Sequence, residues 1–336
     1  MGVISAFRLR TERRRWQIRA IRKRRELSPV ANRTKMIGRG AILCFVTLRN
    51  EKPRLAYFLK YYRKLGVDHF LIVDNGSTDG GREFLAGEPD VSLWSTDASY
   101  RKSRFGTDWQ NWLKLRYGHG HWTLTLDPDE FLVYPFSDTR PLPALCDWLD
   151  QSGMRSFGTM LIDMYPKGAL DAEAYVPGQN PFEIAPWFDA GNYMITKNAK
   201  YGNLWIQGGP RARAYFSDAP EEAPSLNKIP LVKWDRRYAF VNSTHMLLPR
   251  GLNQVYDDKG GEKISGVLLH AKFLDSFIEK AAEEVERRQH FARGREYDAY
   301  HVKGSDTHSL WCPWSERYLD WQQLEHLGLM SKGNWA

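Results

Sequence analysis

The sequence has few cysteines, and none of them shows a metal-binding spacing. Cys44, Cys146 and Cys312 are an odd number scattered over 336 residues. Such sparse usage excludes a disulfide-rich scaffold and argues against a structural zinc site. We therefore expect three reduced thiols in a cytoplasmic protein, with at least two of them buried.

Long apolar runs are also missing. No stretch approaches the roughly 18 consecutive apolar residues of a membrane-spanning helix, so we predict no such helix. The N-terminus lacks the apolar core of a signal peptide, which argues against secretion. A hydrophobic content of 42% with 13% aromatic residues indicates a globular protein. Internal repeats and low-complexity segments are not evident.

The positive charge is confined to one end of the chain. Residues 1–35 hold 12 Lys/Arg and 2 Asp/Glu, whereas the remainder holds 36 against 38. A nearly neutral body argues against a nucleic-acid partner. The basic segment includes Phe7, Trp16 and Ile18 among its arginines, and two interpretations stay open. It is either a solvated arm or a basic amphipathic helix that rests on anionic lipid at the inner membrane.

Strands and helices alternate from about residue 40. Apolar runs predict strands at 41–48, 69–74, 91–95 and 121–127, and the segments between them have helical signals at 53–66, 82–87 and 107–118. This order predicts a parallel sheet with right-handed crossovers. Further on we expect helices at 141–150 and 273–291 and strands at 156–165 and 193–216.

We expect three parts of the chain. They are a basic N-terminal arm (1–38), one α/β catalytic domain (39–292) and a C-terminal extension (293–336) that packs on the core.

Polar clusters follow three of the predicted strands. They occupy 49–51, 74–79 and 127–130. Parallel strands present their carboxyl ends at one edge of a sheet, and ligands bind at that edge. Three clusters there are more than ordinary turns require, so we predict a binding site.

The segment Asp127-Pro128-Asp129-Glu130 is the most acidic of these clusters. In an extended backbone, Asp127 and Asp129 lean to one side and Glu130 to the other. Two carboxylates on one side suit Mg²⁺ or Mn²⁺, which keeps further positions for water and phosphate oxygens. The alternative is a strand-end turn with capping aspartates.

The stretch LRNEKPRLAYFLKYYRKLGVDHFLIVDNGSTDG, followed by DPDEFL, resembles the family 2 type of nucleotide-sugar glycosyltransferase. It is most similar to the bacterial branch with RNE, DNxSTDG and DxDEF motifs. The resemblance is strong over about residues 40–135 and thinner through GGPRARAYF, NKIPLVKW, STHMLLP and SGVLLHAKF. It implies the GT-A fold, a Rossmann-like, mostly parallel mixed sheet flanked by helices.

The implied activity is a metal-dependent, inverting transfer of a sugar from a nucleoside diphosphate sugar to an acceptor hydroxyl. Mn²⁺ or Mg²⁺ would be the cofactor, and the acceptor would be a glycan or glycolipid in bacterial polysaccharide or glycolipid synthesis.

The resemblance also implies roles for individual residues. Asp127, Asp129 and His270 would bind the metal, and Gly208 and Gly209 would face sugar and acceptor. The residues expected along the nucleotide are Arg49, Asn50, Glu51, Asp74, Asn75, Ser77 and Asp79.

Basic residues further along could stabilise the charge of the diphosphate. Arg211, Arg213 and Lys228 are the candidates. Arg211 and Arg213 alternate on a predicted strand and could equally be surface side chains, and Lys228 could be an ordinary loop lysine. His270 is either a ligand or a satisfied core histidine, and His245 is more typical of the latter.

The catalytic base is the least defined element. An inverting transferase needs a carboxylate to accept the proton of the acceptor hydroxyl. No motif singles one out, and we take Glu130 and Asp235 forward as catalytic candidates. The other carboxylates that remain open are Asp189, Asp218, Glu221 and Glu222.

Two other functions remain as alternatives. A sugar-phosphate nucleotidyltransferase would carry a glycine-rich basic loop directly after the first strand, where this chain has RNEKPR. A degenerate transferase that only binds glycans would have no need of Asp127, Asp129 and His270.

Overall fold

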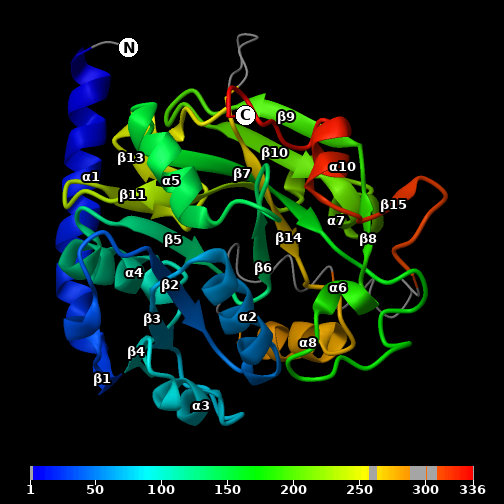
Figure 1. Cartoon of the computed structure of the whole chain (residues 1–336), viewed down its shortest axis with the longest axis horizontal. Helices are drawn as coiled ribbons and strands as arrows, with labels where there is room; N and C mark the ends of the chain where they lie inside the picture. Colours follow the sequence, from blue (N-terminus) through cyan, green and yellow to red (C-terminus); the bar gives the residue numbers. More distant parts are fainter. Residues whose placement is uncertain (1–2, 257–262, 288–299, 301–308, 336) are drawn as a thin grey trace.

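The chain is built around one mixed sheet, seen here in a computed structural model that describes residues 3–256, 263–287, 300 and 309–335 (Figure 1). The nine strands run in the order β1-β4-β3-β2-β5-β11-β7-β14-β6. Their bounds are β1 Ser28–Ala31, β2 Leu43–Leu48, β3 His69–Asp74, β4 Val91–Ser95, β5 Trp122–Leu126, β6 Glu130–Val133, β7 Ser156–Asp163, β11 Asn227–Lys233 and β14 Gly266–His270.

The predicted α/β fold with a mixed sheet is confirmed. The four strands expected from residue 41 onward are β2, β3, β4 and β5, and they pair in parallel. Parallel pairs are not the majority, however. Four of the eight pairings are parallel, and the other four, involving β1, β6 and β11, are antiparallel.

Helices cover both faces of the sheet because successive strand residues point to opposite sides. On one face, Cys44, Val46 and Leu48 join a cluster with α2 (Lys52–Leu65), α3 (Gly81–Gly87) and α5 (Leu142–Gln151). On the other face, Leu43 and Phe45 pack on α4 (Thr107–Leu113), which continues as a π-helical turn over Lys114–Gly118.

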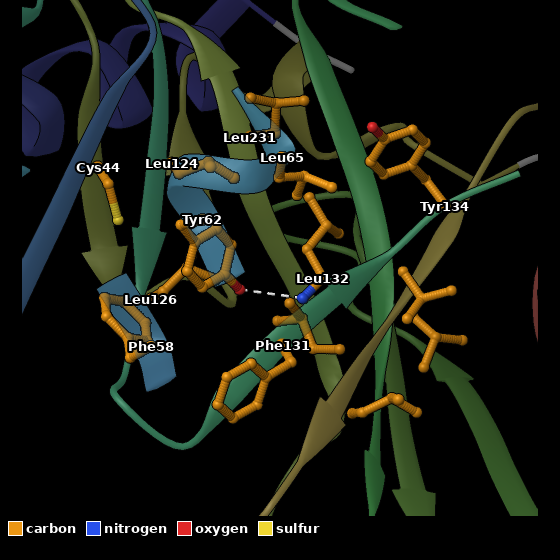
Figure 2. Close-up of a cluster of buried hydrophobic side chains, with 14 of the residues drawn as sticks. Cys44, Phe58, Tyr62, Leu65, Leu124, Leu126, Phe131, Leu132, Tyr134 and Leu231 are labelled. Atoms are coloured by element: carbon orange, nitrogen blue, oxygen red, sulfur yellow. Dashed lines mark hydrogen bonds between the residues drawn. The ribbon is translucent and has the colours of Figure 1, made fainter. Parts of the chain in front are cut away.

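Figure 2 shows the first of these clusters, where Phe58, Tyr62 and Leu65 of α2 face the sheet. The Tyr62 hydroxyl donates to the carbonyl of Glu130 (2.7 Å) and accepts the N–H of Leu132 (2.9 Å). Tyr61 donates to the carbonyl of Leu132 (2.7 Å). Because β6 is an edge strand, these hydroxyls satisfy backbone groups that have no neighbouring strand. Helix α2 thereby fixes the segment that follows the Asp-Pro-Asp motif.

The basic N-terminal arm is a helix, α1 (Val3–Lys23), that runs along one side of the molecule beside α4 (Figure 1). It is not merely a solvated arm, because Leu9 and Ala20 are buried and Arg19 pairs with the buried carboxylate of Asp108 (2.6 Å). Among the described residues, no helix has both the length and the apolar character needed to cross a bilayer.

The segment 193–216 differs from the prediction of strands throughout. It forms a hairpin, β9 (Tyr193–Lys197) with β10 (Leu204–Gly208), and then a helix, α7 (Gly209–Tyr215). The strand ends because Gly208 and Gly209 have positive φ angles (142° and 66°) and Pro210 favours the first turn of a helix. Arg211 and Arg213 therefore lie on a helix and not on a strand.

The remaining elements pack around this frame. The predicted helix 273–291 is α8 (Phe277–Arg287), and residues 288–291 lie outside the described part. In the C-terminal segment, β15 (Ser315–Arg317) pairs with β8 (Trp187–Asp189), and Trp335 is buried against the main cluster. The domain boundaries stay predictions. The other elements are α6 (Pro181–Ile184), β12 (Ala239–Asn242), β13 (Met246–Leu248) and α10 (Trp321–His326).

Cys44 and Cys146 are buried, Cys312 is partly buried, and all three are free thiols, as expected.

Candidate active site

A cleft of about 260 Å³ lies at the carboxyl edge of the sheet. The strands β2, β3, β5, β7 and β14 all end at this edge, whereas β11 runs the opposite way and begins there. The residues that line the cleft are Thr47, Leu48, Arg49, Asn50, Glu51, Asn75, Tyr100, Asp127, Pro128, Asp129, His270, Lys272, Lys280 and Glu283.

The three predicted polar clusters therefore do meet. Residues 49–51 come from the end of β2, Asn75 from the end of β3, and residues 127–129 from the end of β5. Not every member of a cluster faces the cleft, however. Asp74 is buried, accepts the N–H of Ser77 (3.2 Å) and pairs with Arg82 (2.6 Å).

Ser77 and Asp79 support the loop rather than line the cleft. The Ser77 hydroxyl accepts the N–H of Asn50 (3.0 Å). The Asp79 carboxylate accepts the N–H of Lys52 at the start of α2 (2.8 Å) and that of Gly81 (2.9 Å). These bonds join the loops after β2 and β3, so Ser77 and Asp79 support the backbone of the loop that carries Asn50 and Glu51.

A chain of charged side chains leads from the cleft into the interior. Asp129 lies 3.3 Å from His270 Nε2, and His270 Nδ1 lies 2.6 Å from Asp163, which also accepts from Arg211 Nε (2.7 Å). Burial would lower the pKa of His270, but the two carboxylates raise it to about 9. Burial would raise the pKa of Asp129 and of Asp163, yet His270 beside both, with Arg211 beside Asp163, lowers them.

Asp127 stands apart from that chain. Its side chain is 51% exposed, and Lys228 Nζ lies 3.9 Å away. Enclosure by the cleft walls, with the Glu130 carboxylate next to it, raises the pKa of Asp127 above its usual value. Glu130 is buried, pairs with Lys228 (2.8 Å) and accepts the backbone N–H of Asp127 (3.2 Å). Lys228 thus lies on β11 beside two carboxylates and is not a loop lysine, although it does not line the cleft.

The metal assignment fits in part. Asp127 and Asp129 both face the cleft, and two oxygen donors with open positions suit Mg²⁺ or Mn²⁺. His270 is differently placed, because both of its ring nitrogens face carboxylates and its raised pKa keeps it protonated at neutral pH. Within the described ranges, no three His, Cys, Asp or Glu side chains are arranged to hold an ion. Asp127 and Asp129 fit a metal, whereas His270 is arranged as the cationic partner of Asp129 and Asp163.

Helix α8 closes one side of the cleft with residues that the sequence prediction missed. Lys280 pairs with Glu51 (2.7 Å), and Glu283 lies 3.5 Å from Arg49. Arg54 pairs with the same oxygen of Glu51 (2.8 Å). The predicted helix showed its apolar face, and Lys280 and Glu283 at i and i+3 on the other face were the signal that could have been used.

Several predicted residues lie elsewhere. Asp235 follows β11 at the opposite edge of the sheet, next to the start of β5, and pairs with Arg237 (2.9 Å). We do not carry it forward as the base. Gly208 and Gly209 form the β10–α7 junction outside the cleft. Arg211 contacts Asp163 and does not line the cleft.

The other base candidates are also outside the cleft. Asp189 is buried against Arg213 (3.0 Å) and Tyr165, and Asp218, Glu221 and Glu222 are exposed between α7 and β11. His245 Nδ1 donates to the carbonyl of Asn227 (2.6 Å), as a satisfied histidine does.

Comparison with known proteins gives a partial similarity. No family model matches the sequence. A segment of 111 residues is 30% identical to a glycosyltransferase family 92 protein of Arabidopsis thaliana. The match covers 30% of this chain and only 18% of the length of that protein.

Two solved structures show weak similarity. A mannosyltransferase from Pyrobaculum calidifontis, in complex with GDP-mannose and Mn²⁺, is 19% identical, with 46% of each chain covered and a TM-score of 0.28. A protein from Bacillus anthracis described as a glucose-1-phosphate thymidylyltransferase is 10% identical over 86% of this chain and 96% of that one, with a TM-score of 0.29. These scores are too low to establish a common fold.

Proposed function

We propose that this chain is a glycosyltransferase of the GT-A, family 2 type that transfers a sugar from a nucleoside diphosphate sugar to an acceptor hydroxyl. The observation that carries the proposal is the cleft itself. It brings Asp127 and Asp129 together with Arg49, Glu51 and Asn75 from two other strand ends. The glycosyltransferase name of the partly matching plant protein agrees with it.

The charges of the cleft suit a diphosphate. Asp127 and Asp129 would hold Mn²⁺ or Mg²⁺, which would act as a Lewis acid on the departing diphosphate. Arg49, Lys272 and Lys280 line the same cleft and supply positive charge to phosphate oxygens. Two of these side chains are held in place before the ligand arrives, since Lys280 is fixed by Glu51 and Arg49 donates to Asn75 O (3.2 Å).

Glu130 is the carboxylate that we assign as the base. Among the carboxylates considered as the base, Glu130 lines a small pocket beside Asp127, and Lys228 fixes its position. A base there would accept the proton of an acceptor hydroxyl that attacks with inversion at the transferred carbon. The acceptor would be a glycan or glycolipid of a bacterial polysaccharide pathway.

Calorimetric titration of UDP and GDP with and without Mn²⁺ tests the proposal. We expect one of them to bind and Mn²⁺ to tighten binding, and Asp129→Asn to remove the effect of Mn²⁺. Asp235→Asn is the matched control, because it removes a carboxylate at the opposite edge of the sheet and should change nothing. Binding of both nucleotides that ignores Mn²⁺, or an unaltered metal effect in Asp129→Asn, contradicts the proposal.

Activity measurements separate the alternatives. Transfer or slow hydrolysis of a nucleotide sugar is expected of a glycosyltransferase. A nucleotidyltransferase would instead form the nucleotide sugar from a sugar phosphate, and a glycan-binding protein would not respond to nucleotide.

We also propose that α1 contacts an anionic membrane from the cytoplasmic side. Both acidic residues of the segment point inward, since Glu12 pairs with Lys200 (3.0 Å) and Trp109 donates to Glu26 (2.9 Å). The exposed side chains of α1 and the turn after it are basic, with three large apolar ones among them: Phe7, Arg8, Arg10, Arg14, Arg15, Ile18, Ile21, Arg22, Arg24 and Arg25. Such a face suits anionic headgroups.

Co-sedimentation with vesicles tests this contact. The whole chain should bind vesicles that contain phosphatidylglycerol, should not bind pure phosphatidylcholine, and should release as salt is raised. The double variant Arg14→Glu, Ile18→Ser should bind less, because both side chains are exposed. Equal binding of the variant would contradict the contact.

A further inference from the structure

A second, smaller pocket of about 50 Å³ adjoins the cleft and shares Thr47, Tyr100 and Asp127 with it. It lies on the α4 side of the sheet, between the end of β5 and the β12–β13 hairpin. The other residues that line it are Phe105, Thr107, Gln110, Thr125, Leu126, Glu130, Phe240, Ser243 and Thr244.

Three threonine hydroxyls in this pocket have no hydrogen-bond partner. Thr107, Thr125 and Thr244 are only 4%, 8% and 3% exposed, and none of their Oγ1 atoms is bonded within the described structure. A buried polar atom without a partner costs free energy, so each such atom needs an explanation. Three of them in the lining of one pocket indicate that the pocket receives a ligand that bonds to hydroxyls.

Thr123 provides a comparison close to the pocket. It lies on the same strand and the same face as Thr125, two residues away, and is fully buried. Its hydroxyl donates to the carbonyl of Val232 (3.0 Å). Thr47, the fourth threonine of the pocket, accepts from the Gln110 amide (3.1 Å), and outside the pocket the buried Thr159 also has no partner among the described residues. The unpartnered threonine hydroxyls are thus concentrated at the pocket rather than confined to it.

The lining favours an uncharged, hydroxylated ligand. Its polar groups are the two carboxylates of Asp127 and Glu130, the Gln110 amide and hydroxyls, and no lysine or arginine is among the lining residues. A phosphate would be repelled by the carboxylates, whereas sugar hydroxyls can donate to them and to the threonines. The rings of Phe105 and Phe240 give the pocket apolar walls. Its volume suits part of a hexose, such as a hydroxymethyl group and a neighbouring hydroxyl.

We propose that this pocket binds hydroxyl groups of the transferred sugar and that Thr107, Thr125 and Thr244 select among donor sugars. The inference rests on the proposed function, because the shared wall at Asp127 is where the sugar would leave the diphosphate. The cleft and the pocket share Thr47, Tyr100 and Asp127, so a sugar attached to a diphosphate in the cleft would lie next to the pocket. Hydroxyls of the acceptor have the same chemistry, and the experiment separates the two sources.

The experiment compares Thr125→Val and Thr244→Val with the control Thr123→Val. Calorimetry with Mn²⁺ measures the affinity for UDP, GDP, UDP-glucose, UDP-galactose and GDP-mannose. We expect each pocket variant to weaken binding of the preferred nucleotide sugar about 3- to 10-fold, the effect of one uncharged hydrogen bond, with unchanged affinity for the matching nucleoside diphosphate. Thr123→Val should change neither affinity.

Thermal unfolding of the free variants provides a second readout. Thr125→Val and Thr244→Val should leave the melting temperature unchanged or raise it, because valine removes a hydroxyl that has no partner. Thr123→Val should lower it, because the carbonyl of Val232 loses its bond. A pocket variant that loses stability as Thr123→Val does would overturn the inference.

The remaining outcomes are also distinct. If UDP or GDP binds and the pocket variants keep full sugar affinity, the pocket holds only solvent and the inference fails alone. If the variants keep donor affinity but raise the KM of the acceptor, the assignment to the donor sugar is overturned in favour of the acceptor. If wild-type protein binds no nucleotide, the proposed function fails, and the inference fails with it.

Discussion

The substitution Arg211→Met tests whether this arginine acts by supporting the charged chain behind the cleft. Asp163 is almost fully buried and accepts from only two charged groups in the described contacts, Arg211 Nε (2.7 Å) and His270 Nδ1 (2.6 Å). His270 must also balance Asp129. Removing the guanidinium therefore leaves the buried Asp163 carboxylate with His270 as its charged partner in the described contacts. Breaking a buried ion pair from one side costs about 3–5 kcal/mol of unfolding free energy.

Equilibrium unfolding in urea measures this cost, and a double variant identifies its origin. Asp163→Asn combined with Arg211→Met should recover much of the loss, because a neutral amide no longer requires the cation. Arg237→Met is the control, since its solvent-exposed pair with Asp235 should contribute far less to stability. A loss below about 1 kcal/mol for Arg211→Met, or simple additivity with Asp163→Asn, would refute the reasoning.

Three further predictions concern other parts of the frame. Tyr62→Phe should lower the unfolding free energy by about 2–4 kcal/mol, because two buried backbone groups lose their partner. Tyr61→Phe should lower it by about 1 kcal/mol, because one backbone group loses its partner. Equal losses of the two variants in urea unfolding would contradict this. Burial lowers the pKa of Lys114 well below its usual value, so the unfolded chain binds the proton more tightly. Lys114→Met should therefore be more stable than wild type at pH 7, and the difference measured in urea should shrink by about 1.4 kcal/mol per pH unit between the folded pKa and about pH 10.4. Gly106→Ala should destabilise the protein by more than about 1 kcal/mol and weaken nucleotide binding, because φ is +74° and the new Cβ would lie 2.9 Å from Thr47. A melting temperature and a nucleotide affinity equal to those of wild type would exclude this.

The fold was most predictable where local pattern and tertiary role agree. The strands 69–74 and 91–95 coincide with β3 and β4, because their apolar runs are bounded by polar turns and buried on both sides. Three of the strands that escaped assignment share a physical reason. β6 starts with the charged Glu130, β11 contains Lys228, and β14 ends in His270, so ionised or ionisable side chains interrupt the apolar signal in these strands.

Residues of the candidate site were likewise predictable where local pattern and tertiary position agree. Its three polar clusters were predictable because parallel topology forces the carboxyl ends of neighbouring strands to one edge. Asp163 was not predictable, because it becomes relevant only through His270, a partner more than 100 residues away. Lys280 had a signal on the polar face of its helix, but nothing local linked it to its partner Glu51. Asp235 shows the reverse error. Its place in sequence order suggested the cleft, but β11 runs antiparallel to β5 and carries it to the other edge.

The arrangement of charge indicates how these long-range pairs would affect the proposed nucleotide binding. Glu51 fixes both Lys280 (2.7 Å) and Arg54 (2.8 Å), and Glu130 fixes Lys228 (2.8 Å). A cation held in this way loses little further side-chain entropy when a phosphate arrives, which favours binding. Because Lys280 comes from α8 and Glu51 from the loop after β2, the pair also connects α8 to the end of β2. Removing Glu51 should thus weaken nucleotide binding even though a negative charge leaves the cleft, the opposite of what simple charge repulsion predicts. Titration of UDP and GDP into Glu51→Gln decides between the two, since tighter binding would mean that repulsion outweighs the positioning of Lys280.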